Sequence, residues 1–242
     1  MNKAHAIILA AGRGERMRPL TDSCPKPLLQ VHGKPLMQWP MQALAANGFG
    51  QQVVNTAWLG EQIEIYFSSL LGLQRNEILR EQLLNSERLQ LSYSHEGADF
   101  GYALETAGGI CRALPQLVDV FWVLAGDVFA PSFAYSRAAY DKFAQSDKLA
   151  HIWLVPNPPH NPRGDFGLSA EGLALNLPKD AGHALHTYST IGLYKHALFA
   201  PPYCDVPAGN PQGVKAALAP LLRAAMDAGR VSAELFNGEW TD

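Results

Sequence analysis

The sequence carries little charge and no excess of one sign. Charged residues make up 17% of it, against roughly 25% in an average domain. Nineteen lysines and arginines against 22 aspartates and glutamates leave a net charge of −3. Because electrostatic attraction to nucleic acid or to an anionic membrane needs an excess of positive charge, we expect neither among the partners of this chain. The 48% of hydrophobic residues excludes a disordered chain and predicts a well-packed globular protein.

Long apolar runs and paired cysteines are also missing. The longest apolar runs, such as residues 6–11 and 120–125, fall far short of the roughly 18 residues that a membrane-spanning helix needs. The first run leads into arginines rather than into the cleavage site of a signal peptide. Cys24, Cys111 and Cys204 are an odd number and lie far apart, so neither a disulfide framework nor a metal clip is expected. These absences predict a soluble, cytoplasmic protein.

Several catalytic motifs are absent. The eight histidines show no His-x-x-His or His-Glu-x-x-His spacing, and there is no Gly-x-Ser-x-Gly turn, so zinc and serine-hydrolase chemistry are poorly supported. Gly12 and Gly14 begin a dinucleotide-binding motif, but Met17 stands where that motif needs its third glycine. A dinucleotide-dependent oxidoreductase is therefore disfavoured. No Gly-Lys-Ser/Thr follows, which excludes a Walker A loop.

Strand-like and helix-like patterns alternate through the first half. The predicted strands cover residues 6–9, 52–55, 89–94 and 118–125, and the predicted helices cover 35–47, 60–71 and 106–114. Short continuous apolar strands are typical of a parallel sheet that is covered on both faces. The pattern predicts an α/β protein, a three-layer αβα fold of the Rossmann-like kind with a mostly parallel sheet.

The second half is less regular. Its Pro- and Asn-rich residues 157–162 predict a long loop, and residues 214–228 carry an apolar stripe that predicts a helix ending at Gly229. Short strand-like pieces lie around Phe166 and over residues 173–177 and 190–194. We expect this half to add a smaller antiparallel part and a flap to a single domain, 1–242. A polar stretch over residues 72–88 is expected to form a surface excursion.

The loop that follows the first predicted strand is the most informative segment. Gly12 and Gly14 let the backbone turn sharply and bring its N–H groups against a ligand. Four cations follow closely, namely Arg13, Arg16, Arg18 and Lys26. Polyphosphate is the natural ligand of such a loop, although a solvated basic loop has the same composition.

The same segment carries a longer signature. It reads Gly12-Arg13-Gly14-Glu15-Arg16-Met17-Arg18-Pro19-Leu20-Thr21, followed by Pro25-Lys26-Pro27. It resembles the signature of the sugar-phosphate nucleotidyltransferases, G-x-G-x-R-(M/L)-x-P-L-T and then P-K-P. Further segments are similar to the branch of this family that acts on N-acetylmuramate 1-phosphate, and they cover residues 55–60, 96–97, 104–110, 126–128, 163–166 and 238–242.

The resemblance implies a nucleotide-diphospho-sugar transferase fold that binds the nucleotide through residues 1–130 and the sugar through residues 131–242. The implied reaction joins UTP and N-acetylmuramic acid 1-phosphate, giving UDP-N-acetylmuramic acid and pyrophosphate in peptidoglycan recycling. Relatives that join glucose 1-phosphate with UTP or dTTP, or mannose 1-phosphate with GTP, remain alternatives. A catalytically silent sensor of sugar nucleotides is another.

The resemblance also implies roles for residues that match the family. In the reaction, a sugar 1-phosphate oxygen attacks the α-phosphorus of the nucleotide in line, so crowded anions must be neutralised and aligned. Arg16 is implied to face the β- and γ-phosphates, and Lys26 to reach the α-phosphate. A solvated surface salt bridge is the other interpretation of Lys26. The residues implied in nucleotide binding are Ala11, Gly12, Arg13, Gly14, Glu96 and Thr106.

Two aspartates are implied in binding Mg²⁺. Asp127 follows the strand predicted over residues 118–125 and therefore lies where open α/β sheets bind ligands. Asp242 is the second acid by the family match. Carboxylates together with water suit Mg²⁺ that bridges phosphates, although an aspartate after a strand also suits a turn.

For the acceptor sugar, the resemblance implies Asn55, Gly164, Asp165 and Ser189. Each of these residue types also builds loops readily. In the segment over residues 157–167, Arg163 and backbone N–H groups are expected to meet the carboxylate of the muramate lactyl group.

Overall fold

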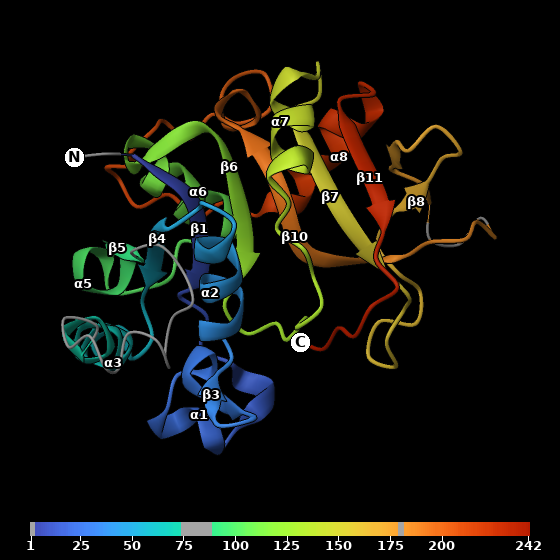
Figure 1. Ribbon diagram of the computed structural model, residues 1–242. Helices are drawn as coiled ribbons and strands as arrows, with labels where there is room; N and C mark the ends of the chain where they lie inside the picture. Colours follow the sequence, from blue (N-terminus) through green and yellow to red (C-terminus); the bar gives the residue numbers. More distant parts are fainter. Residues whose placement is uncertain (1–2, 74–88, 179–181) are drawn as a thin grey trace.

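A single sheet of seven strands forms the centre of the molecule. The computed structural model describes residues 3–73, 89–178 and 182–242. The strands are β1 (Ala4–Ala10), β4 (Gln51–Thr56), β5 (Gln90–His95), β6 (Leu117–Ala125), β7 (Ala150–Val155), β10 (Thr187–Lys195) and β11 (Val231–Leu235). Their order is β11-β7-β10-β6-β1-β4-β5 (Figure 1). Only β10 runs antiparallel to its neighbours, so the predicted mostly parallel sheet is confirmed.

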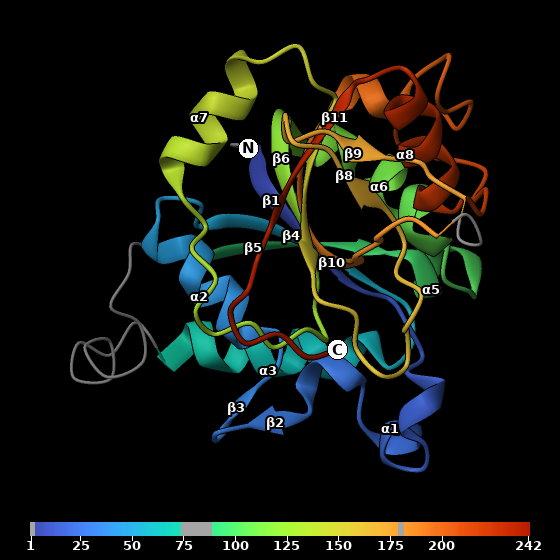
Figure 2. The ribbon, with the colours of Figure 1, turned by 90° about the vertical axis from the view of Figure 1, so that its right-hand side faces the viewer.

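Helices cover both faces of the sheet, as Figure 2 shows. On one face lie α2 (Gln38–Ala46), α3 (Gly60–Leu73) and α7 (Arg137–Gln145), and on the other lie α6 (Glu105–Ala113) and α8 (Leu218–Asp227). A hydrophobic core lies on each face of the sheet, between the strands and the helices that cover that face. Successive residues of β1 point into different cores, since Ile7 packs on the α6 side and Ile8 on the α2 side. The three-layer αβα fold is therefore confirmed. None of the described helices is long and apolar enough to span a membrane.

Smaller elements decorate the sheet. Between β1 and α2 the chain forms a small lobe below the sheet in Figure 1. It comprises η1 (Glu15–Met17), α1 (Leu20–Ser23), η2 (Lys26–Leu28), β2 (Gln30–Val31) and β3 (Lys34–Pro35). Further short elements among the described residues are α5 (Glu96–Phe100), η3 (Leu114–Gln116), η4 (His196–Phe199) and the antiparallel pair β8 (Gly167–Leu168) and β9 (Ala174–Leu175).

The order of the strands locates the ligand-binding edge. β1 is flanked by β4 on one side and by β6 on the other, so the chain connections diverge at β1. Ligands of open α/β sheets bind outside the carboxyl ends of the strands at such a switch point. The residues there are Ala10, Thr56 and Ala125, with the loops that follow them.

The helix predicted over residues 35–47 begins later than expected, at Gln38. Val31 and Lys34 pair across a two-residue turn in which His32 and Gly33 both have positive φ, at 50° and 77°. Positive φ at both central positions is typical of a tight hairpin, and a proline favours extended backbone in the residue before it. Residues 34–35 are therefore a strand.

The helix predicted over residues 214–228 also begins later, at Leu218. The side chain of Asn210 bonds the N–H and the carbonyl of Val214, both at 2.9 Å. The carbonyl of Ala216 accepts hydrogen bonds from two N–H groups at the start of α6, at 2.9 and 3.0 Å. These contacts hold residues 214–217 against α6 in a non-helical backbone, which an apolar stripe cannot reveal.

The longer elements that lie outside the segments predicted from sequence include α7, β7 and β11. β11 pairs in parallel with β7, so the second half adds parallel as well as antiparallel pairs. The strand expected over residues 173–177 shrinks to β9, and Phe166 makes only an isolated bridge to His186. Of the excursion expected over residues 72–88, positions 72–73 end α3 and the rest lies outside the described residues.

Two cysteines that are distant in sequence meet in the core. Cys111 of α6 and Cys204 place their Sγ atoms 3.7 Å apart, and all three cysteines are free thiols. The two cysteines are 93 residues apart in the chain, so the sequence did not predict this contact. Burial and the neighbouring sulfur raise the pKa of the Cys111 thiol, which keeps it protonated and unreactive at neutral pH.

Two fully buried tyrosines make the fold sensitive to alkaline pH. Burial raises the pKa of Tyr135 and of Tyr194 above the ordinary phenol value of 10. Each phenol therefore stabilises the fold fully below pH 10, and this stabilisation is lost as the pH rises toward the folded pKa. We expect each to lower the free energy of unfolding by about 1.4 kcal/mol per pH unit above its unfolded pKa.

Urea unfolding at a series of pH values between 8 and 11.5 measures this slope. Tyr135→Phe should make the slope shallower by about 1.4 kcal/mol per pH unit. A slope equal to that of the parent would show that Tyr135 ionises as readily in the fold as in the unfolded chain.

Candidate active site

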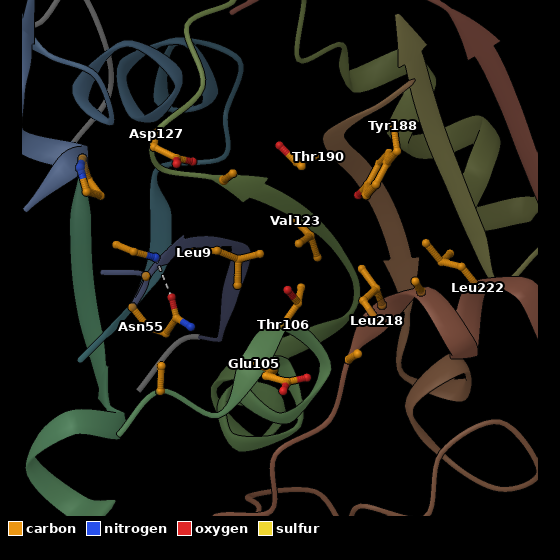
Figure 3. Close-up of a pocket in the computed structure, with 18 of the residues that line it drawn as sticks. Leu9, Asn55, Glu105, Thr106, Val123, Asp127, Tyr188, Thr190, Leu218 and Leu222 are labelled. Carbon is orange, nitrogen blue, oxygen red and sulfur yellow. Dashed lines mark hydrogen bonds between the residues drawn. The ribbon is translucent and has the colours of Figure 1, made fainter. Parts of the chain in front are cut away.

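A pocket of about 640 Å³ opens at the carboxyl ends of β1, β4 and β6 (Figure 3). Leu9, Asn55 and Asp127 lie on one side of it in the figure, and Tyr188 and Leu222 lie on the other. The pocket is thus built from both halves of the chain. Of the residues expected at the site, those that line it are Ala11, Gly12, Gly14, Lys26, Asn55, Glu96, Thr106, Asp127 and Asp165.

The loop after β1 leaves room for close approach of a ligand. Apart from its chain neighbours, none of the described residues has an atom within 4 Å of the position that a Cβ on Gly12 would take. Gly14 has φ 65°, the left-handed region that favours glycine, and a Cβ there would lie 3.1 Å from the Cβ of Lys26. The hydroxyl of Thr21 donates to the carbonyl of Gly14 at 2.8 Å. Glycine thus keeps the loop packed against Lys26 while its backbone faces the pocket.

A buried chain of hydrogen bonds joins the ends of β1, β4 and β5. Asn55 accepts from the N–H of Ala10 at 2.7 Å and donates to Oε1 of Glu96 at 2.6 Å. Oε2 of Glu96 accepts from the N–H of Leu104 at 2.7 Å. Burial raises the pKa of Glu96, whereas these two hydrogen bonds favour its charged form. Both carboxylate oxygens already have protein partners, so Glu96 fixes the start of α6, and its contact with a nucleobase stays a prediction.

Lys26 and Asp127 form an ion pair in the pocket. Nζ of Lys26 lies 2.9 Å from Oδ2 of Asp127. Lys26 is 7% exposed and stands in η2 between Pro25 and Pro27, which restrict its backbone. The Asp127 side chain is 36% exposed and therefore reaches solvent. Lys26 is a pocket lysine rather than a solvated surface lysine.

The last residues of the chain are tied to the segment after β6. Phe129 and Thr241 exchange two backbone hydrogen bonds, at 2.8 and 3.0 Å, as an antiparallel bridge. The indole N–H of Trp240 donates to the carbonyl of Ser189 at 3.1 Å. Asp242 comes directly after this bridge, so tertiary contacts hold it near the carboxyl end of β6.

Asp242 contacts two basic side chains. Its Oδ2 lies 3.5 Å from Nη2 of Arg16, and its Oδ1 lies 3.0 Å from Nε2 of His160. The Arg16 side chain is 70% exposed, so solvent screens this pair. Oδ1 is buried, and none of the residues that the structure describes aligns a donor for a hydrogen bond to it. Arg16 and Asp242 are brought together, but neither lines the pocket.

Asp127 and Asp242 fit a divalent cation that also binds phosphate. Within the described parts of the chain, no group of three or more His, Cys, Asp or Glu residues is arranged to hold a metal ion. Mg²⁺ needs no such cage, because it keeps several waters and binds through one or two carboxylates and substrate phosphates. The buried Oδ1 of Asp242, which lacks an aligned donor, agrees with a ligand that the protein does not supply.

The residues expected to bind the acceptor sugar fall into two groups. Asp165 lines the pocket, and its Oδ2 accepts from the side chain of Asn161 and from the N–H of Tyr188, at 3.1 and 3.0 Å. Gly164, with φ 64°, does not line it, because it packs against the backbone of residues 185–186. Ser189 is fully buried, and its hydroxyl donates to the carbonyl of Trp153 at 2.7 Å. The structure therefore does not bring Gly164 or Ser189 to the pocket.

Sequence reasoning missed other residues of the pocket wall. Tyr188 and Thr190 line it, as expected of the strand neighbours of an inward-packed Ser189. Glu105 lines it with φ 60°, a conformation that is uncommon outside glycine and concentrates at functional sites. Arg13 lies outside, with its guanidinium 4.3 Å from the ring centre of Trp58. The sequence carried no signal for these residues, because a register irregularity between Tyr188 and Gly192 interrupts β10 and because no local pattern marks the positive φ of Glu105.

Comparison with known proteins identifies the family. The profile described as nucleotidyl transferase matches residues 5–242. The chain belongs to the nucleotidyl transferase family. This confirms the sugar-phosphate nucleotidyltransferase signature and makes the chain a member of an enzyme family rather than a dinucleotide-dependent oxidoreductase.

Two similar proteins of known name agree with this family membership. The chain is 41% identical to the N-acetylmuramate α-1-phosphate uridylyltransferase of Neisseria meningitidis serogroup B, over 98% of this chain and 91% of that protein. It is 31% identical to the protein of the same name from Caulobacter vibrioides, over 73% of this chain and 69% of that one.

Solved structures share the fold of this nucleotidyl transferase. UDP-glucose pyrophosphorylase from Acinetobacter baumanii has a TM-score of 0.72 at 17% identity, covering 100% of this chain and 88% of that one. The inositol-1-phosphate CTP transferase from T. maritima has a TM-score of 0.69 at 18% identity, covering 100% and 89%. Both likenesses concern the fold alone, and they confirm the expected nucleotide-diphospho-sugar transferase fold.

Proposed function

We propose that this nucleotidyl transferase joins UTP and N-acetylmuramic acid 1-phosphate, giving UDP-N-acetylmuramic acid and pyrophosphate in peptidoglycan recycling. The 41% identity to the Neisseria enzyme over nearly the whole chain carries the proposal. The pocket supports it, because the glycine loop and Lys26 share one cavity with Asp165 and Tyr188 of the second half. The nucleotide is assigned to residues 1–130 of a single domain, and the acceptor is assigned to residues 131–242 together with Asn55.

The nucleotide side is assigned to the loop after β1. Backbone N–H groups of residues 11–14 meet the phosphates, since Gly12 leaves room for them to approach. Arg13, whose guanidinium stacks on Trp58, adds positive charge beside this loop. Glu96 and Thr106 are assigned to the base end, where Glu96 also holds the start of α6.

Lys26 and Arg16 neutralise the reacting phosphates. An oxygen of the sugar 1-phosphate forms a bond to the α-phosphorus, and the bond from that phosphorus to the bridging oxygen breaks as pyrophosphate leaves. The ion pair with Asp127 already holds the Lys26 ammonium group in the pocket. We assign this group to the α-phosphate, where negative charge is redistributed in the transition state. Arg16 is exposed and lies beside Asp242, so it is placed to follow the outer phosphates.

Asp127 and Asp242 are assigned to Mg²⁺. The cation, when bound, neutralises phosphate charge and helps to align the phosphates. Different parts of the fold position the two aspartates. Asp127 follows β6 directly, and Asp242 is held by the bridge between Phe129 and Thr241. Lys26 and Arg16 balance the two carboxylates before substrate binds.

The acceptor side is assigned to Asn55, Gly164, Asp165 and Ser189. Asn55 and Asp165 line the pocket and are placed for direct contact. Gly164 and Ser189 act through neighbours, because Gly164 lets the loop before Asp165 pack tightly and Ser189 binds the indole of Trp240.

An activity screen tests the function. UTP, dTTP, GTP, CTP and ATP are each combined with several sugar 1-phosphates in the presence of Mg²⁺, and pyrophosphate release is measured. We expect the highest kcat/KM for UTP with N-acetylmuramic acid 1-phosphate. A clear preference for glucose or mannose 1-phosphate would refute the substrates and leave the reaction class intact, and binding without pyrophosphate release would indicate a silent sensor.

Neutralising either metal-binding acid should raise the Mg²⁺ requirement. We expect Asp127→Asn to shift the Mg²⁺ titration of activity to concentrations about tenfold higher or more, and Asp242→Asn to shift it less, because phosphates and water supply the other ligands. Asp141→Asn, in an exposed pair with Arg137 on α7, is the matched control. Titration curves for both variants that coincide with the parent's would reject the two-carboxylate metal site.

A further inference from the structure

The far wall of the pocket carries a cation that the proposed phosphate chemistry does not use. Among the described residues that line the pocket, Lys26 and Arg223 bear positive charge. Lys26 is engaged with Asp127 on the nucleotide side. Arg223 stands on α8, which supplies the opposite wall together with Leu218 and Leu222 (Figure 3). Its charge therefore faces the part of the cavity assigned to the acceptor sugar.

Contacts on three sides hold the Arg223 guanidinium in place. Nη1 donates to the side-chain oxygen of Asn176 at 2.5 Å, and Nη2 lies 3.5 Å from the carbonyl of Asp165. The guanidinium stands 5.0 Å from the ring centre of Phe166. Asn176 is itself fixed by two hydrogen bonds to Asp227, at 3.0 and 3.2 Å. A guanidinium has five N–H donors, so these two hydrogen bonds leave donors for a ligand.

The surroundings of Arg223 suit a small group that is both apolar and anionic. Leu218 and Leu222 of α8 and Phe166 are buried side chains of the pocket wall. Arginine binds a carboxylate through two parallel N–H donors, and the pair is stronger where water is partly excluded. A methyl group can pack on the leucines while a neighbouring carboxylate reaches the guanidinium. A lactyl ether has this combination.

We propose that Arg223 binds the lactyl carboxylate of the acceptor and determines the preference for a muramate over an N-acetylglucosamine 1-phosphate. The inference rests on the proposed function. It assigns the role to Arg223 instead of to Arg163, which does not line the pocket. Arg223 is a specificity residue, because the carboxylate lies on the sugar and not at the reacting phosphorus.

Kinetics with two acceptors test the assignment. Parent and Arg223→Met enzymes are compared with N-acetylmuramic acid 1-phosphate and with N-acetylglucosamine 1-phosphate, which lacks the lactyl group. Removing a charged hydrogen-bond partner should lower kcat/KM for the muramate by about 10- to 100-fold. The value for N-acetylglucosamine 1-phosphate should stay within about twofold, because that acceptor makes no such bond.

Two further variants make the result specific. Arg230→Met removes a partly exposed arginine that donates to the carbonyl of Asp147 and does not line the pocket, and it should change kcat/KM for neither acceptor. Arg223→Lys keeps the charge and most of the packing but lacks the planar fork, so it should lose part of the preference. It also carries the test if Arg223→Met does not fold.

The outcomes separate the two claims. A parent that prefers the muramate, together with an Arg223→Met enzyme that keeps this preference, overturns the inference and leaves the proposed function standing. Equal losses with both acceptors would show a structural role and also overturn it. Loss of the preference in Arg163→Met instead would favour the loop over residues 157–167. A parent without any preference for the muramate overturns both claims.

Discussion

Lys26→Ala is expected to lower kcat by about 100-fold or more while the protein stays folded, because a preorganised charge on the reacting phosphate is worth several kcal/mol in the transition state. The side chain is 7% exposed and lies 2.9 Å from Asp127, so its charge is held in the pocket with little screening. Asp127 reaches solvent, and its loss of a partner should therefore cost little stability. Pyrophosphate release at saturating substrates and thermal unfolding measure the two effects.

A second variant at position 26 and a control variant at a distant lysine show whether the loss of activity is specific to the Lys26 ammonium group. Lys26→Arg should restore little activity, since a broad planar fork does not replace a compact ammonium group between two prolines. Lys142→Ala, at an exposed position of α7, should behave as the parent does. Turnover near the parent's value in folded Lys26→Ala would reject the role assigned to this lysine.

Gly109→Ala is expected to lower the free energy of unfolding by about 3–5 kcal/mol, through overpacking and broken buried hydrogen bonds. A Cβ at this position in α6 would lie 2.8 Å from Nδ2 of Asn55 and closer still to Oε1 of Glu96. These two atoms form the 2.6 Å bond that joins β4 to the start of α5. Because Asn55 also holds the N–H of Ala10, the displacement should weaken nucleotide binding as well.

The matched control is Gly72→Ala in α3. Among the described residues, and apart from its chain neighbours and the backbone of α3 itself, no atom stands within 4 Å of the Cβ position at Gly72. The substitution should therefore have little steric cost and should stabilise the helix by about 0.5–1 kcal/mol. Urea unfolding of both variants and the affinity of each for UTP are the measurements. If Gly109→Ala is as stable as the parent, the Asn55–Glu96 pair moves freely and does not define the pocket.

The first half of the fold could be read from local pattern. Ile7 and Ile8 belong to one continuous apolar run, and both are buried because parallel strands are covered on both faces. The strand predicted over residues 52–55 is one residue shorter than β4 at each end, and the strand predicted over residues 118–125 begins one residue later than β6. Helix boundaries were read less well, since Lys34–Pro35 and residues 214–217 are held in non-helical backbone by a hairpin and by α6.

Some residues of the candidate site were also predicted from the sequence, and others were not. The loop motif and the end of a predicted strand pointed to four residues of the site from the sequence alone, and the structure places all four at one pocket, namely Gly12, Gly14, Lys26 and Asp127. Which side of β10 faces that pocket was not readable, because a register irregularity between Tyr188 and Gly192 interrupts the strand. Tyr188 and Thr190 consequently line the pocket in place of Ser189.

By itself, the sequence determined the family, the alternating α/β architecture and the loop of glycines and cations. These depend on residues that are close together in the chain, where strand period, turn chemistry and motif spacing act locally. Only the tertiary structure decided that Trp240 and Thr241 anchor Asp242 beside the segment after β6, and that Arg223 lines the same pocket as Lys26. Such contacts join segments far apart in the chain, and their formation depends on how the layers pack rather than on any local pattern.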